Sequence, residues 1–274
     1  MKINRLRKSI IFSSFAAFAL FFLHLPFVYA QNPSANALPQ GANTVNGTTN
    51  INYSGNNLNV TASDKSIINW NSYNIGQVNS VNYIQPSSSA VVLNRVVGVD
   101  PSSIYGSLNA NGRVFLVNPN GILFGAGSQI NVNALMASTL DISNSDFIAG
   151  KYNFFQNGKP GWIINQGHIH ISNGGYVALL SNAIANSGVI EAPLGHVVLA
   201  TGQTATVMGL DDNSDISVVI NDAVANGVFG PDGLKMTNAI DNSGSITADG
   251  STILLTAKIL NGIFDNAINN TGVV

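Results

Sequence analysis

His168 and His170 are the first residues of this chain whose types and spacing have chemical content. They are two positions apart, so a β-strand places both side chains on one face. Glu191 follows 21 residues after His170, and one structural repeat of that length would set the carboxylate beside the imidazole. Two imidazoles and a carboxylate can bind a metal ion. Exposed polar residues on stacked strands more often form an ordinary cross-strand pair, so we expect no metal ligands and no cofactor.

A second group of candidate residues is acidic. Asp211, Asp212 and Asp215 fall in a short stretch with Asn and Ser. Clustered carboxylates bind calcium, and with a basic proton acceptor they serve polysaccharide lyases built as parallel β-helices. The nearest basic residue is Lys235, and a solvated turn has the same composition. The sequence has no Gly-rich phosphate loop, serine nucleophile elbow or HExxH motif. We therefore expect no catalytic residues and keep a lyase-like enzyme as the alternative.

Residues 1–30 have the composition of an export signal. A basic start precedes the almost wholly apolar run 10–27, and Val28-Tyr29-Ala30 supplies small residues at the two positions that determine cleavage. An uncleaved membrane anchor is the alternative, because the apolar run approaches spanning length. Pro26 and the cleavage-like tripeptide favour a removable signal. We expect the general secretory translocon to export the chain and the mature protein to begin at Gln31.

The mature chain is sparsely charged. Four of the eleven Lys and Arg residues lie in residues 1–30, which leaves seven against thirteen acidic residues, a net charge of −6. Nucleic-acid binding needs a basic surface, so we expect no nucleic-acid partner. The chain has no cysteine, which excludes disulfides and thiolate sites and suits export of an unfolded chain through a narrow pore.

The second half of the chain repeats itself. An Asn-x-Gly motif followed by a short apolar strand occurs four times, and the first two copies are 21 residues apart, a period typical of a parallel β-solenoid. Its copies begin at Asn165, Asn186, Asn242 and Asn270. Stacked coils allow asparagine side chains to form hydrogen-bonded ladders. The last copy has no polar cap after it, which favours the front part of a longer protein or an end covered by something else.

Alternation within these repeats predicts which side chains face the interior. The inward set is Ile169, Ile171, Ile190, Ala192, Ile246 and Ala248. The outward set is His168, His170, Val189, Glu191, Ser245 and Thr247.

The remaining segments do not share this period. Residues 43–86 contain a hairpin, 49–53 and 58–61, and we expect them to cap the first coil, with Trp70 as a core residue; a sugar-stacking platform is the alternative. We expect residues from about 87 to 274 to form the solenoid. Two excursions interrupt it. In residues 141–161 we expect Phe147, Tyr152, Phe154 and Phe155 to pack on the coils, and residues 203–238 should add strands at 216–220 and near Val228.

A tight turn organises the centre of the chain. Apolar strands at 114–117 and 122–124 flank Asn118-Pro119-Asn120-Gly121. Asn at the first position can bond the backbone of its own turn, Pro presets φ at the second, and Gly suits the fourth position of a type I turn. The tetrapeptide alone is compatible with any β-turn.

Four ordered segments, 68–76, 87–96, 112–125 and 136–142, give this chain a resemblance to the secretion domains of exoproteins exported by the two-partner pathway. That family includes filamentous haemagglutinin and the high-molecular-weight adhesins. The resemblance implies an all-β fold, a right-handed parallel β-helix with an N-terminal β cap and extra-helical strand or hairpin insertions, over residues 31–274.

The resemblance also implies partners and a site. Such domains are recognised by an outer-membrane β-barrel transporter with periplasmic docking domains, and folding outside the cell draws the chain outward. The family's turn motif falls on Asn118, Pro119, Asn120, Gly121 and Ile122, and the run 87–96 adds Asn94 and Arg95. The adhesin branch matches better, because Ile84-Gln-Pro-Ser87 stands where the haemagglutinin branch has a second Asn-Pro motif.

The expected location is the bacterial cell surface or the medium, reached through the periplasm. We expect sequence downstream of residue 274 to carry adhesion to a host or neighbouring cell. A stalk for a contact-dependent toxin remains the third possibility.

Overall fold

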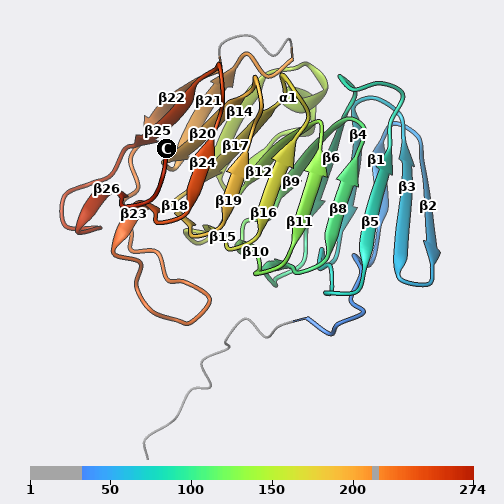
Figure 1. Cartoon of the computed structure of the whole chain (residues 1–274), viewed down its shortest axis with the longest axis horizontal. Coiled ribbons are helices and arrows are strands. Elements are labelled where there is room, and N and C mark those ends of the chain that lie inside the picture. Colours follow the sequence, from blue (N-terminus) through green and yellow to red (C-terminus); the bar gives the residue numbers. More distant parts are fainter. Residues whose placement is uncertain (1–32, 212–215) are drawn as a thin grey trace, which may run out of the picture.

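The computed structural model describes residues 33–211 and 216–274. The chain winds into a parallel β-helix whose coils stack along the long axis, from β2 and β3 at one end to β23 and β26 at the other (Figure 1). The predicted β-helix is confirmed. The predicted signal, residues 1–30, lies outside the described residues. Within the described part, no helix has the length and hydropathy to span a bilayer.

One eight-stranded sheet faces the viewer in Figure 1, and we call it the front sheet. Its inward side chains are buried and its outward ones are half-exposed, as alternation predicts; Ile169, Ile190 and Ile246 lie in the core. Its strands, in spatial order, are β2 (Thr49–Ser54), β3 (Asn57–Ala62), β5 (Ser80–Ile84), β8 (Ser107–Ala110), β11 (Gln129–Val132), β16 (His168–Ile171), β19 (Val189–Glu191) and β24 (Ser245–Thr247).

The second eight-stranded sheet lies behind the front sheet and is buried on both faces over most of its length. We call it the covered sheet. Its strands, in spatial order, are β1 (Asn43–Asn46), β4 (Ser66–Trp70), β6 (Val91–Val96), β9 (Arg113–Val117), β12 (Ala134–Ser138), β17 (Tyr176–Ser181), β20 (His196–Thr201) and β25 (Ile253–Ala257).

A six-stranded sheet closes the third side of the coils. It contains the Asn-x-Gly repeats, whose asparagines form the predicted ladder: Asn165 donates to Asn186 at 2.8 Å and Asn186 to Asn242 at 2.7 Å. The glycines stack directly: a Cβ on Gly188 would lie 2.2 Å from the carbonyl oxygen of Gly167. Its strands are β7 (Ser102–Ile104), β10 (Ile122–Phe124), β15 (Trp162–Asn165), β18 (Ala183–Asn186), β23 (Asn238–Asn242) and β26 (Asn266–Asn270).

The two predicted excursions meet in space and form one antiparallel sheet over the covered sheet. It is the outer sheet, with strand order β13 (Leu140–Ile142), β14 (Tyr152–Gln156), β21 (Thr204–Met208) and β22 (Ser217–Asp222), and α1 (Asn144–Ile148) lies between β13 and β14. Phe147, Tyr152 and Phe154 pack against the coils as predicted. Phe155 is 42% exposed, so its predicted packing is wrong: it occupies the outward position of the alternating strand β14.

One further sequence prediction meets a different structure, and the N-terminal end combines antiparallel with parallel pairing. The predicted strand near Val228 is absent from the described residues 216–274; Val228 is buried in a loop held by an isolated bridge between Phe229 and Lys235. At the N-terminal end of the described residues, β1 pairs antiparallel with β4 and β2 with β3, an isolated antiparallel bridge joins Gln40 to Ser72, and parallel stacking already begins with β3 on β5 and β4 on β6. Trp70 is fully buried, as predicted for a core residue.

Candidate functional site

The turn at Asn118 is a hydrogen-bonded junction between consecutive coils. Asn118 is completely buried, and its Nδ2 donates to the carbonyl oxygen of Asp100 and to Ser102 Oγ, both at 3.0 Å. Its Oδ1 accepts from the backbone N–H of Asn120 at 3.0 Å, which is the local bond that the sequence predicts. Its own N–H donates to the carbonyl of Ser138 on the next coil at 3.0 Å. One side chain therefore fixes the turn to the coil before it, and its backbone fixes it to the coil after.

Gly121 and Ile122 complete the turn for steric and packing reasons. Gly121 has φ of +126°, and a Cβ there would lie 2.8 Å from Cε2 of Trp162. A larger residue would have to displace that buried ring. Ile122 is fully buried and aligns in β10 with Ser102 on one side and Ile163 on the other. It belongs to the core rather than to an accessible surface.

Arg95 points outward from β6 and holds the outer sheet against the coils. Its Nε donates to Asp141 Oδ1 at 2.8 Å, Nη1 donates to Asn144 Oδ1 at 2.7 Å, and Nη2 donates to the carbonyl of Ile142. The side chains of Arg95 and Asp141 are only 11% and 13% exposed. Asp141 also accepts from Asn157 Nδ2 at 3.1 Å. Sequence reasoning missed this role of Asp141, although the residue lies within the run 136–142.

Asn94 occupies the opposite face of the same strand, inside the β-helix. Its Oδ1 accepts from Trp70 Nε1 at 2.9 Å and from the Tyr83 hydroxyl at 2.6 Å. Tyr73 continues this network with a 3.1 Å contact between the two tyrosine hydroxyls. The side chain is completely buried, so Asn94 satisfies the polar atoms of the core rather than facing a partner.

Two adjoining hollows bring part of the predicted site to the surface. The smaller, of about 290 Å³, is lined by Arg95 and Asp141, and the larger, of about 880 Å³, by Lys159 and Trp162; Pro119, Asn120 and Asn157 line both. The larger hollow also has exposed apolar walls, with Val99 at 84% and Phe229 at 58% exposure. We call the two hollows together the motif surface. Of the predicted site residues it includes Arg95, Pro119 and Asn120.

The second candidate site is the histidine pair. His168 Nε2 and His170 Nδ1 contact the same oxygen, Glu191 Oε2, at 2.9 and 3.4 Å. Glu191 stands beside His170 in the register of β16 with β19, as the 21-residue spacing predicts. The hydrogen bond from His168 lowers the pKa of the Glu191 carboxyl below its usual value. An ionised carboxylate only accepts hydrogen bonds, so both ring nitrogens donate in this arrangement.

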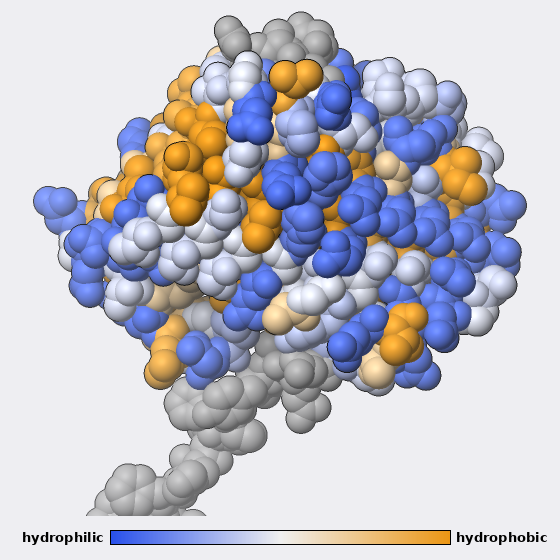
Figure 2. Space-filling model, in the orientation of Figure 1, coloured by the Kyte–Doolittle hydropathy of each residue, from blue (hydrophilic) through white to orange (hydrophobic). Residues whose placement is uncertain are grey.

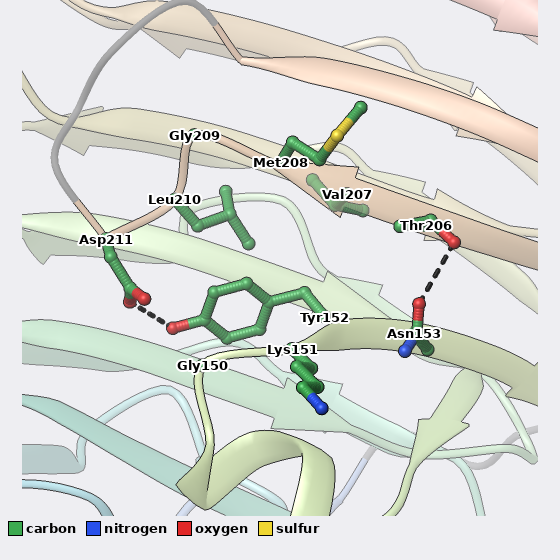
Figure 3. Close-up of a pocket in the computed structure, with 10 residues that line it drawn as sticks. All are labelled: Gly150, Lys151, Tyr152, Asn153, Thr206, Val207, Met208, Gly209, Leu210 and Asp211. Carbon is green, nitrogen blue, oxygen red and sulfur yellow. Dashed lines mark hydrogen bonds between the residues drawn. The ribbon is translucent and has the colours of Figure 1, made fainter.

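The structure describes one of the three acidic candidates, Asp211. Asp212 and Asp215 lie outside the described residues, and Asp211 accepts a hydrogen bond from the Tyr152 hydroxyl (Figure 3). Tyr152 and Asp211 line a hollow of about 430 Å³, and Figure 3 shows Lys151 at its edge. Lys235 is not among the residues that line this hollow. The backbone oxygen of Asp211 accepts from the buried Arg113 at 2.8 Å. Asp211 therefore holds the segment that follows β21 against the coils through its bond with Arg113.

Comparison with known proteins identifies the family. The profile described as "TPS secretion domain" matches residues 35–274. The crystal structure of the HMW1 secretion domain from Haemophilus influenzae superposes with a TM-score of 0.69 at 33% identity, covering 80% of this chain and 57% of that chain.

Curated relatives agree with this match. A heme/hemopexin-binding protein from Haemophilus influenzae strain Rd is 34% identical over 207 residues, which is 70% of this chain and 23% of that protein. A second Haemophilus influenzae protein with the same description is 41% identical over 105 residues, or 38% of this chain and 11% of the relative. The chain thus spans less than a quarter of the length of either relative. Because the family profile covers nearly the whole chain, and a solved secretion domain shares its β-helix, this protein belongs to the TPS (two-partner secretion) secretion domain family.

Proposed function

We propose that residues 31–274 are the N-terminal secretion domain of an exported adhesin-like protein, recognised by an outer-membrane β-barrel transporter with periplasmic docking domains. The single observation that carries this proposal is the family match over residues 35–274. The leader predicted for residues 1–30 would deliver the chain through the general secretory translocon to the periplasm. The destination is the cell surface or the medium.

The physical basis of export would be folding of the coils outside the cell. In a solenoid each coil contacts mainly its neighbours, so a first stable group of coils can template the next. Asn118 ties its turn to Asp100 and Ser102 of the preceding coil. We assign the segment Asn118–Ile122 the role of fixing this first group of coils. The β-helix requires no bound nucleotide for this role, and we propose no enzymatic activity for the domain.

Because the coils fold outside the cell, recognition by the transporter acts, in this proposal, on the unfolded chain: an extended segment around the turn motif adds as a strand to a sheet edge of the docking domains. Val99 is an apolar residue near Pro119 and Asn120 in sequence that the folded core leaves 84% exposed, so its side chain is available for recognition without being needed for stability. Arg95, already paired with Asp141, shapes the wall of the smaller hollow. In the longer exoprotein, we place adhesion to a host or neighbouring cell in sequence outside this domain.

The test is transporter-dependent release of the full chain into the medium, with the cognate transporter present or absent. Asn118→Ala removes the bonds of a buried amide and should destabilise the fold by about 1–3 kcal/mol and reduce release. Val99→Asp changes a side chain that is 84% exposed, so it should reduce release while leaving the unfolding midpoint unchanged. Val78→Asp, at a position 57% exposed and absent from the lining of the motif surface, is the matched control.

The outcomes distinguish a failure of the proposed secretion function from a failure of the assigned recognition site. Retention of the wild-type chain in the periplasm with the transporter present would overturn the secretion function. Transporter-dependent release that is equal for the wild type, Val99→Asp and Val78→Asp would retain the function and reject Val99 as part of the recognised segment.

A further inference from the structure

The outward face of the front sheet carries a three-residue group that the secretion function does not use. Glu191 is the only glutamate among the thirteen acidic residues of the chain, and it lies between two of the four histidines. We propose that His168, His170 and Glu191 bind a divalent transition-metal ion, with Zn²⁺ as the ion best suited to two imidazoles and one carboxylate.

The positions of the ligand atoms favour this assignment. One donor atom from each residue lies within 4.8 Å of the other two, and the two contacts to Glu191 Oε2 measure 2.9 and 3.4 Å. With metal–ligand bonds near 2.1 Å, a tetrahedral ion holds its ligands about 3.4 Å apart. Binding therefore requires small side-chain rotations and no change in the backbone, with the proton on each ligating ring nitrogen moving to the other ring nitrogen or, from a doubly protonated ring, to solvent.

The backbone beneath the three residues is rigid. β16 lies between β11 and β19 with continuous parallel registers, so the spacing of the two histidines and the glutamate is fixed by hydrogen-bonded strands. Ile169 and Ile190, the inward neighbours of the ligands, are completely buried in the core. A site built on strands holds its geometry better than one built on a loop.

The surroundings leave the site open to a cation. Among the described residues, the side chains that contact the Glu191 carboxylate are the two histidines, and no lysine or arginine is paired with it. The outward neighbours in register, Gln129 and Asn131 on one side and Ser245 and Thr247 on the other, are all uncharged. The three side chains are 37–44% exposed, so a fourth coordination position faces solvent. Water or a ligand from another molecule can occupy that position.

Metal binding would join two successive coils. His170 and Glu191 are 21 residues apart in sequence, and stacking of β16 on β19 brings them together. The unfolded chain retains only the His-x-His pair, so the ion should bind the folded state more tightly and raise its melting temperature.

The experiment is calorimetric titration of the metal-free, folded full chain with Zn²⁺, together with thermal unfolding in the presence and absence of the ion. We expect one saturable site per chain and a rise in Tm. His168→Ala, His170→Ala and Glu191→Gln should each weaken binding at least tenfold and remove most of the Tm rise. Glu191→Gln retains the shape of the side chain, so it controls for misfolding.

His196→Ala is the matched control, because His196 is a surface histidine that contacts Ser251 and is not part of the group. Its Zn²⁺ affinity should equal that of the wild type. The proposal is overturned by absence of saturable binding in the wild type. Equal binding by the wild type and a properly folded Glu191→Gln variant would likewise reject the three-residue site.

Discussion

The front sheet and the covered sheet enclose the same core, but the outward side chains of the front sheet are mainly polar and those of the covered sheet are mainly apolar. Each has a row of outward side chains that runs from coil to coil in strict register. On the front sheet the row is Asn59, Asn82, Asn109, Asn131, His170 and Glu191. On the covered sheet it is Ile67, Leu93, Phe115, Met136, Ala178 and Val198.

The polar row remains in contact with solvent and bonds to itself. Asn82 donates to Asn59 at 3.0 Å and Asn109 donates to Asn82 at 2.9 Å. Figure 2 shows mainly hydrophilic residues over the strands at the N-terminal end of this face. The apolar row is instead buried beneath α1 and the outer sheet. A parallel sheet that is apolar on both faces needs a cover, and the two excursions supply it. The excursions are therefore part of the fold's core rather than surface decoration.

The largest effect should come from the covered row. Phe115 is completely buried, with ring centroids 5.6 Å from Phe147 and 5.5 Å from Tyr152. Phe115→Ala leaves a cavity between the coil and its cover, so we expect a loss of about 3–5 kcal/mol in the free energy of unfolding. Denaturant unfolding measures it. A loss under about 1 kcal/mol would show that the cover contributes little.

A smaller effect is expected at the polar attachment of the cover. Arg95→Ala leaves Asp141 buried without its charged partner, and we expect a loss of about 2–3 kcal/mol. Hydrogen exchange should accelerate first in β13 and β14, which the arginine holds. Arg95→Lys keeps the charge but not the fork of donors, so it should restore only part of the protection. Uniform acceleration over all coils would contradict a local attachment.

Alkaline titration probes the same cover. Burial raises the pKa of the Tyr176 hydroxyl well above its usual value, and burial together with the bond to Asp211 does the same for Tyr152. A raised folded-state pKa gives stability that is complete below the ordinary pKa and is lost as pH rises above it. Stability should fall by about 1.4 kcal/mol per pH unit for each such group above about pH 10.

Phenolate absorbance and unfolding measured across this pH range test the prediction. Tyr176→Phe removes the ionisable hydroxyl and should therefore remove its share of the pH dependence. The Tyr176 hydroxyl has no hydrogen-bond partner among the described residues, so the substitution breaks no hydrogen bond. Ionisation of Tyr176 at its ordinary pKa, with the fold intact, would mean that the cover admits solvent.

The smallest effect belongs to the exposed ladder. Asn109→Ala removes ladder bonds at a solvent-accessible position, and we expect a change of about 0.5 kcal/mol or less. Asn186→Ala is the buried counterpart, because Asn186 is 1% exposed and bonds to Asn165 and Asn242. That change should cost about 1–3 kcal/mol. Equal losses in the free energy of unfolding, measured with denaturant, would show that the contribution of a ladder hydrogen bond to stability does not depend on its burial.

Local patterns in the sequence predicted two features of the geometry of the candidate sites. The turn chemistry of Asn118 and the placement of Glu191 beside His170 follow from spacing alone, and both are present in the structure. The roles of Asn94 and Arg95 do not follow from spacing. They are adjacent in sequence, yet Asn94 bonds Trp70 inside the core and Arg95 bonds Asp141 outside it.

By itself, the sequence determined the β-helix, the inward and outward faces of its repeats and the asparagine ladder, because each depends on alternation and on a short period. Only the tertiary structure decided that the two excursions pair with each other as β14 and β21 and cover one sheet. It also decided that Arg95 reaches Asp141, 46 residues away. Contacts between segments without a common period depend on the path of the whole chain, and no local pattern records that path.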